Sequence, residues 1–152
     1  MDDIYDIAKS QSTNLTGEDI NNILECIENN SNPFFINKTT KMVIQEIQEI
    51  LNNNTVNDVE KVSEKLIGYR YIDEVHEILR GRHVKWVNIS KSPKKLKGGG
   101  IVLNIKFLDN GVHILCSQGN RITQYKFDEC LTFQKLTEQE QLILMANEYI
   151  DK

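Results

Sequence analysis

Histidine and cysteine side chains could bind a metal ion, and His113 and Cys116 have a spacing that zinc ligands use. Structural zinc sites normally take a pair of ligands from each of two chain segments, and the sequence holds no second pair of this kind. On a strand, residues three positions apart also point to opposite faces. The sequence therefore predicts no metal site and no cofactor.

The stretch KLKGGGIV, residues 95–102, has the glycine content of a phosphate-binding loop. A P-loop, however, needs a Gly-Lys-Ser/Thr element that opens a helix, and here a strand pattern comes after the glycines. We therefore expect no nucleotide hydrolysis at this stretch. Gly98 to Gly100 are instead predicted to allow a sharp bend or a bulge in a sheet.

Catalytic groups show no local signature in this chain. A cysteine and a histidine from distant segments could meet in the fold, but nothing in the sequence around the three cysteines indicates an activated thiol. The acidic pairs Asp73–Glu74 and Asp128–Glu129 are adjacent in sequence, so their side chains diverge. We therefore predict that the protein is not an enzyme.

A cluster of basic residues is the strongest candidate for a binding site. The predicted binding residues are Arg82, Lys85, Lys91, Lys94, Lys95, Lys97, Arg121 and Tyr125. A small β-barrel can bind nucleic acid with a basic face and one or two stacking aromatic rings, which Trp86 and Tyr125 could supply. Two other interpretations stay open. The lysines could coat a solvated surface, or they could dock against acidic residues of the same chain.

The charge is distributed unevenly along the chain. Residues 1–79 carry 6 Lys/Arg and 15 Asp/Glu, a balance of −9, whereas residues 80–152 carry 12 and 7, a balance of +5. Within residues 80–127 there are 10 basic residues and one acid, Asp109. The asymmetry indicates two electrostatically different parts. The sequence pI of 5.4 counts against a dedicated nucleic-acid binder.

Composition and length indicate an ordinary globular chain of 152 residues, 39% of them hydrophobic and 26% charged. No run of 18 apolar residues is present, so we expect no membrane partner. The acidic start MDDIYDIAKS lacks a hydrophobic signal region, and the three cysteines are an odd number without a CxxC pair. We therefore expect reduced thiols and a protein that is not secreted.

The first half has helical periodicity. Apolar stripes predict helices within residues 16–30, 39–53 and 55–68, with a short fourth helix within residues 71–81. Thr55 is the expected N-cap of the third helix, and Asp58 occupies the position that a capping box gives to an acid. These elements make residues 1–80 an acidic helical part, predicted to pack against the second half of the chain.

The second half changes to strand periodicity. Five short strands are expected between residues 81 and 136, with Asn110-Gly111 as the strongest hairpin signal. Residues 137–152 are predicted to form a helix that docks on the body, with Thr137 and Glu140 as a capping box. The expected fold class is α+β: a helical N-terminal part, a small basic five-stranded antiparallel SH3-like barrel, and a C-terminal helix. An OB-like barrel fits less well, because it would want longer strands.

A family resemblance rests on residues 81–136. The shared pattern is Gly81-Arg82 opening a strand, Trp86 within it, the element formed by Leu96, Gly98 and Gly99, and a later strand that ends in Leu131 to Phe133. This pattern resembles a recurrent segment in uncharacterised proteins of giant nucleocytoplasmic DNA viruses of the mimivirus and megavirus group. It covers about 55 of the 152 residues. The resemblance implies an origin in a large virus of amoebae and carries no catalytic chemistry.

These observations together predict a non-enzymatic interaction or structural protein of a large DNA virus, whose barrel surface contacts a protein partner. The alternative is a nucleic-acid-binding accessory factor that uses the basic strand and loop around residues 80–97. The expected location is the host cytoplasm, at the viral factory, or the virion. The sequence identifies neither the partner nor the oligomeric state.

Overall fold

The computed structural model describes residues 33–150 of the chain. Contacts divide the chain into two compact units, one formed by Met1–Val43 with Leu136–Lys152 and the other by Ile44–Lys135. The helix predicted within residues 16–30 lies outside the described residues. The division at residues 80/81 and 136/137, which is based on composition, stays a prediction.

The described part of the first unit contains a 3-10 helix, η2 (Pro33–Phe35), the first turn of α3 (Thr40–Asn53), and α5 (Glu138–Ile150). The capping box predicted for α5 is present, because the Thr137 amide donates to Glu140 Oε1 and the Glu140 amide donates to Thr137 Oγ1. The buried Asn147 amide donates to the carbonyls of Phe35 and Lys38, at 2.8 Å each. These bonds tie α5 to the segment around η2.

Helix α3 agrees with its predicted range, and helix α4 (Val59–Lys65) is shorter than expected. The expected cap at Thr55 is wrong. Thr55 and Asp58 both have positive φ, and α4 starts only after Asp58, which makes no side-chain capping hydrogen bond. The left-handed conformation of these two residues forms a tight turn between α3 and α4, and this turn takes up residues that were expected in the helix.

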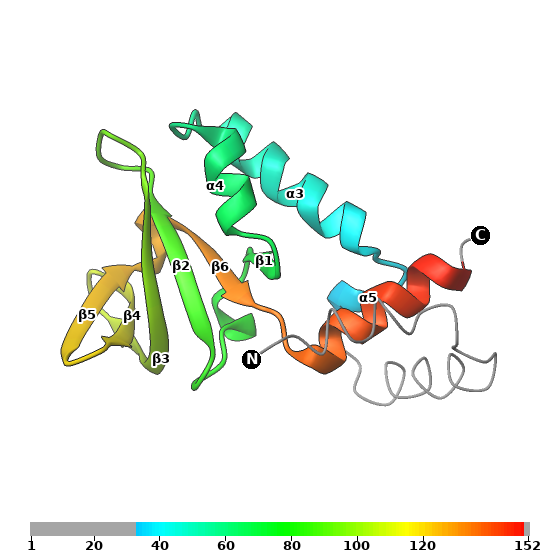
Figure 1. The fold of residues 1–152 in the computed structure, drawn as a ribbon. Coiled ribbons are helices and arrows are strands. Elements are labelled where there is room, and N and C mark those ends of the chain that lie inside the picture. Colours follow the sequence, from blue (N-terminus) through cyan, green and yellow to red (C-terminus); the bar gives the residue numbers. More distant parts are fainter. Residues whose placement is uncertain (1–32, 151–152) are drawn as a thin grey trace. The chain divides into compact units, whose positions relative to one another are not determined.

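The second unit is built on one antiparallel sheet of six strands in the order β1-β6-β2-β3-β4-β5 (Figure 1). Helix α4 lies beside β2 and β6, on the side that faces away from β4 and β5 (Figure 1). The strands are β1 (Tyr69–Ile72), β2 (His83–Asn88), β3 (Leu96–Leu108), β4 (Gly111–Gln118), β5 (Arg121–Lys126) and β6 (Cys130–Lys135).

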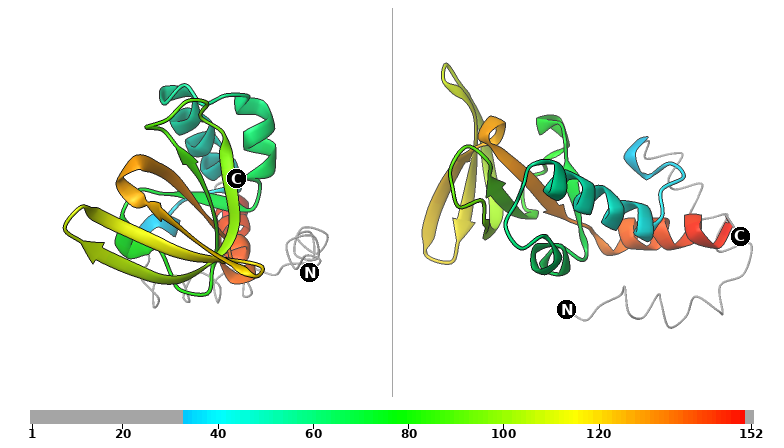
Figure 2. Two further views of the ribbon diagram at one scale, coloured as in Figure 1. Left: turned by 90° about the vertical axis from the view of Figure 1, so that its left-hand side faces the viewer. Right: turned by 90° about the horizontal axis from the view of Figure 1, so that it is seen from above.

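The sheet is open, so the prediction of a closed five-stranded barrel is corrected. Strands β1 and β5 are its two edges, and no ladder joins them. The sheet is nevertheless strongly bent (Figure 2). The bend brings the Tyr125 hydroxyl of β5 within 3.1 Å of Thr132 Oγ1 of β6, so the two strands touch through side chains without backbone pairing.

The extra strand, β1, lies where a short fourth helix was expected. Residues Tyr69 to Ile72 pair with Lys135 to Thr132 of β6, and only Val75–Glu77 forms a single 3-10 turn, η3. The apolar spacing of this segment suits a helix and a strand edge about equally. Pairing with β6, the last strand in the sequence, decides the outcome.

Glycines give β3 its irregularity, as predicted. Val84 pairs with Gly100 and Lys85 with Gly98, so Gly99 is an extra residue in the β2–β3 ladder. Gly98 and Gly99 have φ near +104° and +103°, in the region that favours glycine. The β3–β4 hairpin is also confirmed, but its two turn residues are Asp109 and Asn110, and Gly111 already pairs with Leu108.

The concave face of the sheet encloses the main core of the second unit. Its centre is the indole of Trp86 stacked on the ring of Tyr125, with centroids 4.3 Å apart and planes 16° from parallel. The other buried members of this cluster are Ile72, Ile78, Val84, Val102, Ile114, Cys116 and Cys130. On the opposite face, Val87, Leu131 and Phe133 are also buried. Strands β2 and β6 are therefore covered on both faces.

Candidate interaction surface

The loop between β2 and β3 is fastened to the α3–α4 turn by a predicted binding residue. The ammonium group of Lys94 donates to the carbonyl of Asn54 at 2.7 Å and to Thr55 Oγ1 at 3.0 Å. The Asn57 amide donates to the Lys94 carbonyl at 3.1 Å. The positive charge of Lys94 thus stabilises backbone carbonyls after α3, where the helix dipole is negative. Lys94 therefore binds within its own chain, as the docking interpretation expects, but its partners are a carbonyl and a hydroxyl group and not acidic side chains.

Lys85 and Arg82 are also engaged within the unit. The Lys85 ammonium donates to the carbonyl of Lys65, the last residue of α4, at 3.3 Å, and lies 5.0 Å from the centre of the Tyr69 ring. Burial, together with the nearby charges of Lys65 and Lys135, lowers the pKa of Lys85. Arg82 donates to the Lys135 carbonyl at 3.2 Å. The Lys85 contact links β2 to α4, and the Arg82 contact links the residue just before β2 to the end of β6. Because both cations are engaged in this way, fewer cations remain available for a ligand.

Tyr125 was predicted to bind a partner with its ring, and the structure places that ring in the core. Tyr125 is 7% exposed and Trp86 is 4% exposed, so neither offers a face to an incoming base. Burial raises the pKa of Tyr125 far above its usual value, and the hydrogen bond to Thr132 only partly offsets this. The signal that selected Tyr125 was its aromatic ring in a basic strand, which does not distinguish a core ring from a surface ring.

The remaining four predicted binding residues are exposed. Lys91, Lys95 and Lys97 lie between β2 and the start of β3, and Arg121 begins β5. Lys91 and Lys97 are both near Cys130. Burial and the charge of Glu129 raise the pKa of the Cys130 thiol to about 11, while these two lysines act in the opposite direction. The structure therefore brings part of the predicted basic cluster together and separates the rest.

His113 and Cys116 lie on opposite faces of β4, as their spacing predicts. Cys116 faces the concave core, and its pKa is raised to about 11 by burial. The His113 ring accepts from the Gln124 amide at Nδ1 (2.7 Å), and its Nε2 is 3.0 Å from Asn110 Oδ1. These two contacts hold the His113 ring against Gln124 and Asn110. Among the described residues, no group of three or more His, Cys, Asp or Glu side chains could hold a metal ion.

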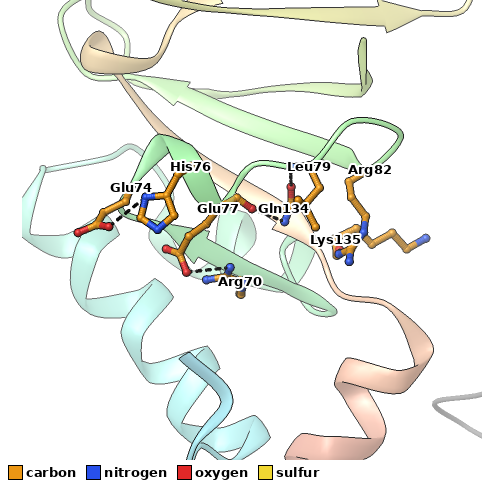
Figure 3. Close-up of polar contacts among 8 residues, drawn as sticks. All are labelled: Arg70, Glu74, His76, Glu77, Leu79, Arg82, Gln134 and Lys135. Carbon is orange, nitrogen blue, oxygen red and sulfur yellow. Dashed lines mark hydrogen bonds and ion pairs between the residues drawn. The ribbon is translucent and has the colours of Figure 1, made fainter. Parts of the chain in front are cut away.

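A buried polar cluster near β1 has a structural role (Figure 3). Arg70 is 2% exposed and pairs with Glu77 at 3.2 Å. Gln134 accepts from the Leu79 amide at 2.9 Å and donates to the Glu77 carbonyl at 3.2 Å. These bonds fix the connection between β1 and β2 to the middle of the sheet. These contacts give the cluster a structural role, because they link β1, η3 and β6.

The outer face of β3, β4 and β5 carries exposed aliphatic side chains that the sequence reasoning missed. Cross-strand pairing places Ile101, Ser117 and Ile122 in one row, and Asn104, Leu115 and Gln124 in the next. Leu103 is a bulged residue beside Asn104, because the register shifts between Val102 and Asn104. We define the outer apolar patch as the exposed residues Ile101, Leu103 and Ile122 together with the half-buried Leu115.

Exposure sets the outer apolar patch apart from the core. Ile122 is 69% exposed, Leu103 43% and Ile101 38%, whereas Val102 between them is 1% exposed. The stretch IVLNI could have predicted the exposed side chains. Neighbouring residues of a strand point to opposite faces, and Ile101, Val102 and Leu103 are all aliphatic, so aliphatic side chains must lie on both faces of the sheet.

No protein-family model matches the chain, and no curated protein or solved structure is similar to it. Between residues 33 and 150, no helix is both long and apolar enough to cross a membrane.

Proposed function

We propose that the protein is a non-enzymatic interaction protein and that the outer apolar patch binds a protein partner. The observation that carries the proposal is the group of solvent-exposed aliphatic side chains on the outer face of β3 and β5, with Ile122 at 69% exposure. Apolar surface gathered in this way is typical of interaction sites, because its removal from water favours association by about 25 cal/mol per Å².

The charge around the patch supports an acidic partner. Residues 80–127, which include β2 to β5, carry 10 basic residues and one acid. Lys106 and Lys126 flank His113 on the same face as the patch. A second copy of the same face would bring like charges together. The patch therefore suits a different protein, with an apolar centre and acidic residues around it.

Nucleic-acid binding, the alternative, has weaker support from the geometry. Three observations weigh against it: Tyr125 and Trp86 are buried, Lys85 and Lys94 have partners within the unit, and the patch is aliphatic. The exposed residues Lys91, Lys95 and Lys97 are the cations that such binding would use. An origin in a large DNA virus is part of the proposal and rests on the resemblance of residues 81–136.

Site-specific cross-linking tests the protein-binding surface. A photoreactive amino acid at position 122 in the full chain should cross-link one acidic protein in infected host cells. With that partner purified, Leu103→Asp should weaken its affinity by about tenfold or more, as expected for a residue central to an interface. Met42→Asp is the matched control, because Met42 is 42% exposed and lies in the other unit.

Two outcomes would overturn this proposal. One is equal loss of affinity with Leu103→Asp and Met42→Asp. The other combines no cross-link at position 122 with salt-dependent binding of fluorescently labelled DNA or RNA that is lost when the exposed residues Lys91, Lys95 and Lys97 are all changed to Glu. The second result would make nucleic-acid binding the leading hypothesis.

A further inference from the structure

A hollow of about 220 Å³ lies between the middle of α3 and helix α4. Its lining residues are Ile44, Gln48, Glu60, Ser63, Glu64 and Ile67. Ile44 and Gln48 are four residues apart on α3, and the others recur at spacings of three or four residues along α4 and just beyond its end. Each helix therefore presents one face to the hollow. All six residues belong to the same unit of the fold.

The size of the hollow fits one side chain better than a small-molecule ligand, since pockets for drug-sized ligands have roughly 300–1,000 Å³. Ile44 and Ile67 supply apolar walls, and Ile67 is 61% exposed. Ser63 is 8% exposed and lines the hollow with a small side chain. Its hydroxyl oxygen is buried and makes no hydrogen bond within the described part of the chain.

The charges at the hollow have one sign. Glu60 and Glu64 are four residues apart on α4, an arrangement in which two like charges destabilise a helix. Neither carboxylate makes a hydrogen bond or ion pair with the residues that the structure describes, and no basic residue lines the hollow. A cation bound between the two carboxylates would relieve their repulsion.

We propose that this hollow binds a lysine or arginine side chain from a basic segment of a partner protein. The aliphatic stem of such a residue would lie against Ile44 and Ile67, while its cationic group meets Glu60 and Glu64 at the rim. The site is separate from the outer apolar patch, and it does not rest on the function proposed for that patch.

Fluorescence anisotropy on the full chain tests the hollow with a defined probe. The probe is a labelled amphipathic peptide of leucine and lysine at helical spacing, compared with the same peptide carrying glutamate in place of lysine. The lysine peptide should bind and the glutamate peptide should not. Glu64→Lys should raise the Kd by about tenfold, which corresponds to about 1.4 kcal/mol. Glu49→Lys, the same charge change on an exposed α3 residue outside the hollow, should leave the Kd within about twofold.

A second variant tests shape without changing charge. Gln48 lines the hollow from α3, so Gln48→Trp should fill the space, weaken the lysine peptide and leave the fold intact by circular dichroism. Three results would overturn the proposal: equal weakening by Glu49→Lys and Glu64→Lys, full binding by Gln48→Trp, or no binding of the lysine peptide at about 100 μM. The first would identify nonspecific attraction to the acidic surface.

Discussion

At the scale of single residues, Trp86 dictates what its neighbours can be. Its indole stacks on Tyr125 on one side and lies directly over Gly98 of the adjacent strand on another. A Cβ atom at Gly98 would stand 2.6 Å from Cζ3 of the indole, a distance that no real contact tolerates. Gly98 is therefore required both by its positive φ and by the ring above it.

Gly98→Ala and Gly99→Ala separate these two requirements. Both residues have φ near +104°, so alanine at either position should destabilise the fold by about 1–3 kcal/mol through backbone strain. A Cβ at Gly99 meets nothing within 4 Å, whereas one at Gly98 collides with Trp86, which should add about 1–3 kcal/mol. Urea unfolding monitored by Trp86 fluorescence measures both. Equal losses would show that the indole can move aside freely.

Lys94 shows at the residue scale why the candidate site was only partly predictable. The seven predicted basic residues have the same chemistry in the sequence, but Lys94 stabilises the end of α3 while Lys95 next to it is exposed. Which lysine bonds the chain and which faces solvent depends on the α3–α4 turn, whose left-handed Thr55 and Asp58 no local pattern predicted. Whether a predicted basic residue bonds within the chain or stays exposed therefore depends on which residues lie near it in the fold.

At the scale of elements, hydrogen bonds from Lys94 hold the β2–β3 loop against the α3–α4 turn. Lys94→Met keeps much of the aliphatic stem and removes the hydrogen bonds to Asn54 and Thr55, so it should destabilise the fold by about 1 kcal/mol. Amide hydrogen exchange at Asn57, which bonds the Lys94 carbonyl, should accelerate.

Lys95→Met is the control for this prediction, because Lys95 is exposed and its replacement should change stability by no more than about 0.5 kcal/mol. If the two variants unfold at the same urea concentration and Asn57 exchanges at the wild-type rate in both, the loop is held by its backbone alone.

Elements with a strong local signal were predictable from the sequence. The α3 stripe, the α5 capping box, the β3–β4 hairpin and the glycine bulge all depend on residues close together in the chain. Strand β1 and the open sheet were missed for the opposite reason. Arg70 faces Gln134 and Ile72 faces Thr132, so β1 forms only when a strand from much later in the sequence is in place.

At the scale of the whole molecule, stability should decrease in alkaline solution. Burial raises the pKa of Cys116 and Cys130 from 9.0 to about 11, and it raises the pKa of Tyr125 further still. Above pH 9 the unfolded chain loses these protons and the folded chain keeps them. The stability that these groups contribute is therefore fully present below about pH 9 and declines as the pH rises, by at most about 1.4 kcal/mol per pH unit for each group.

Urea unfolding between pH 8 and pH 11 measures this decline, and Cys116→Val should make it shallower because one buried thiol is gone. The lowered pKa of Lys85 acts in the opposite direction, so the comparison of the two proteins isolates the thiol. Identical slopes for wild type and Cys116→Val would mean that Cys116 reaches solvent at high pH in the folded state.

The two proposed surfaces of the second unit have opposite charges. The outer apolar patch lies in the basic stretch of the chain, and the hollow between α3 and α4 has an acidic rim. An acidic partner and a basic one could therefore be bound by one chain without competing for the same charges. On these proposals the protein would link an acidic partner protein to a basic one.

The pairing of Tyr69 with Lys135 has a consequence for the architecture as a building unit. The first residue of β1 and the last residue of β6 are register partners, so the chain enters and leaves the six-stranded sheet at the same place. A module with adjacent ends can be spliced into a surface loop of another protein, or circularly permuted, without opening its ladders. Residues 69–135 therefore have the connectivity of a unit that can be inserted into another protein with both ends at one point.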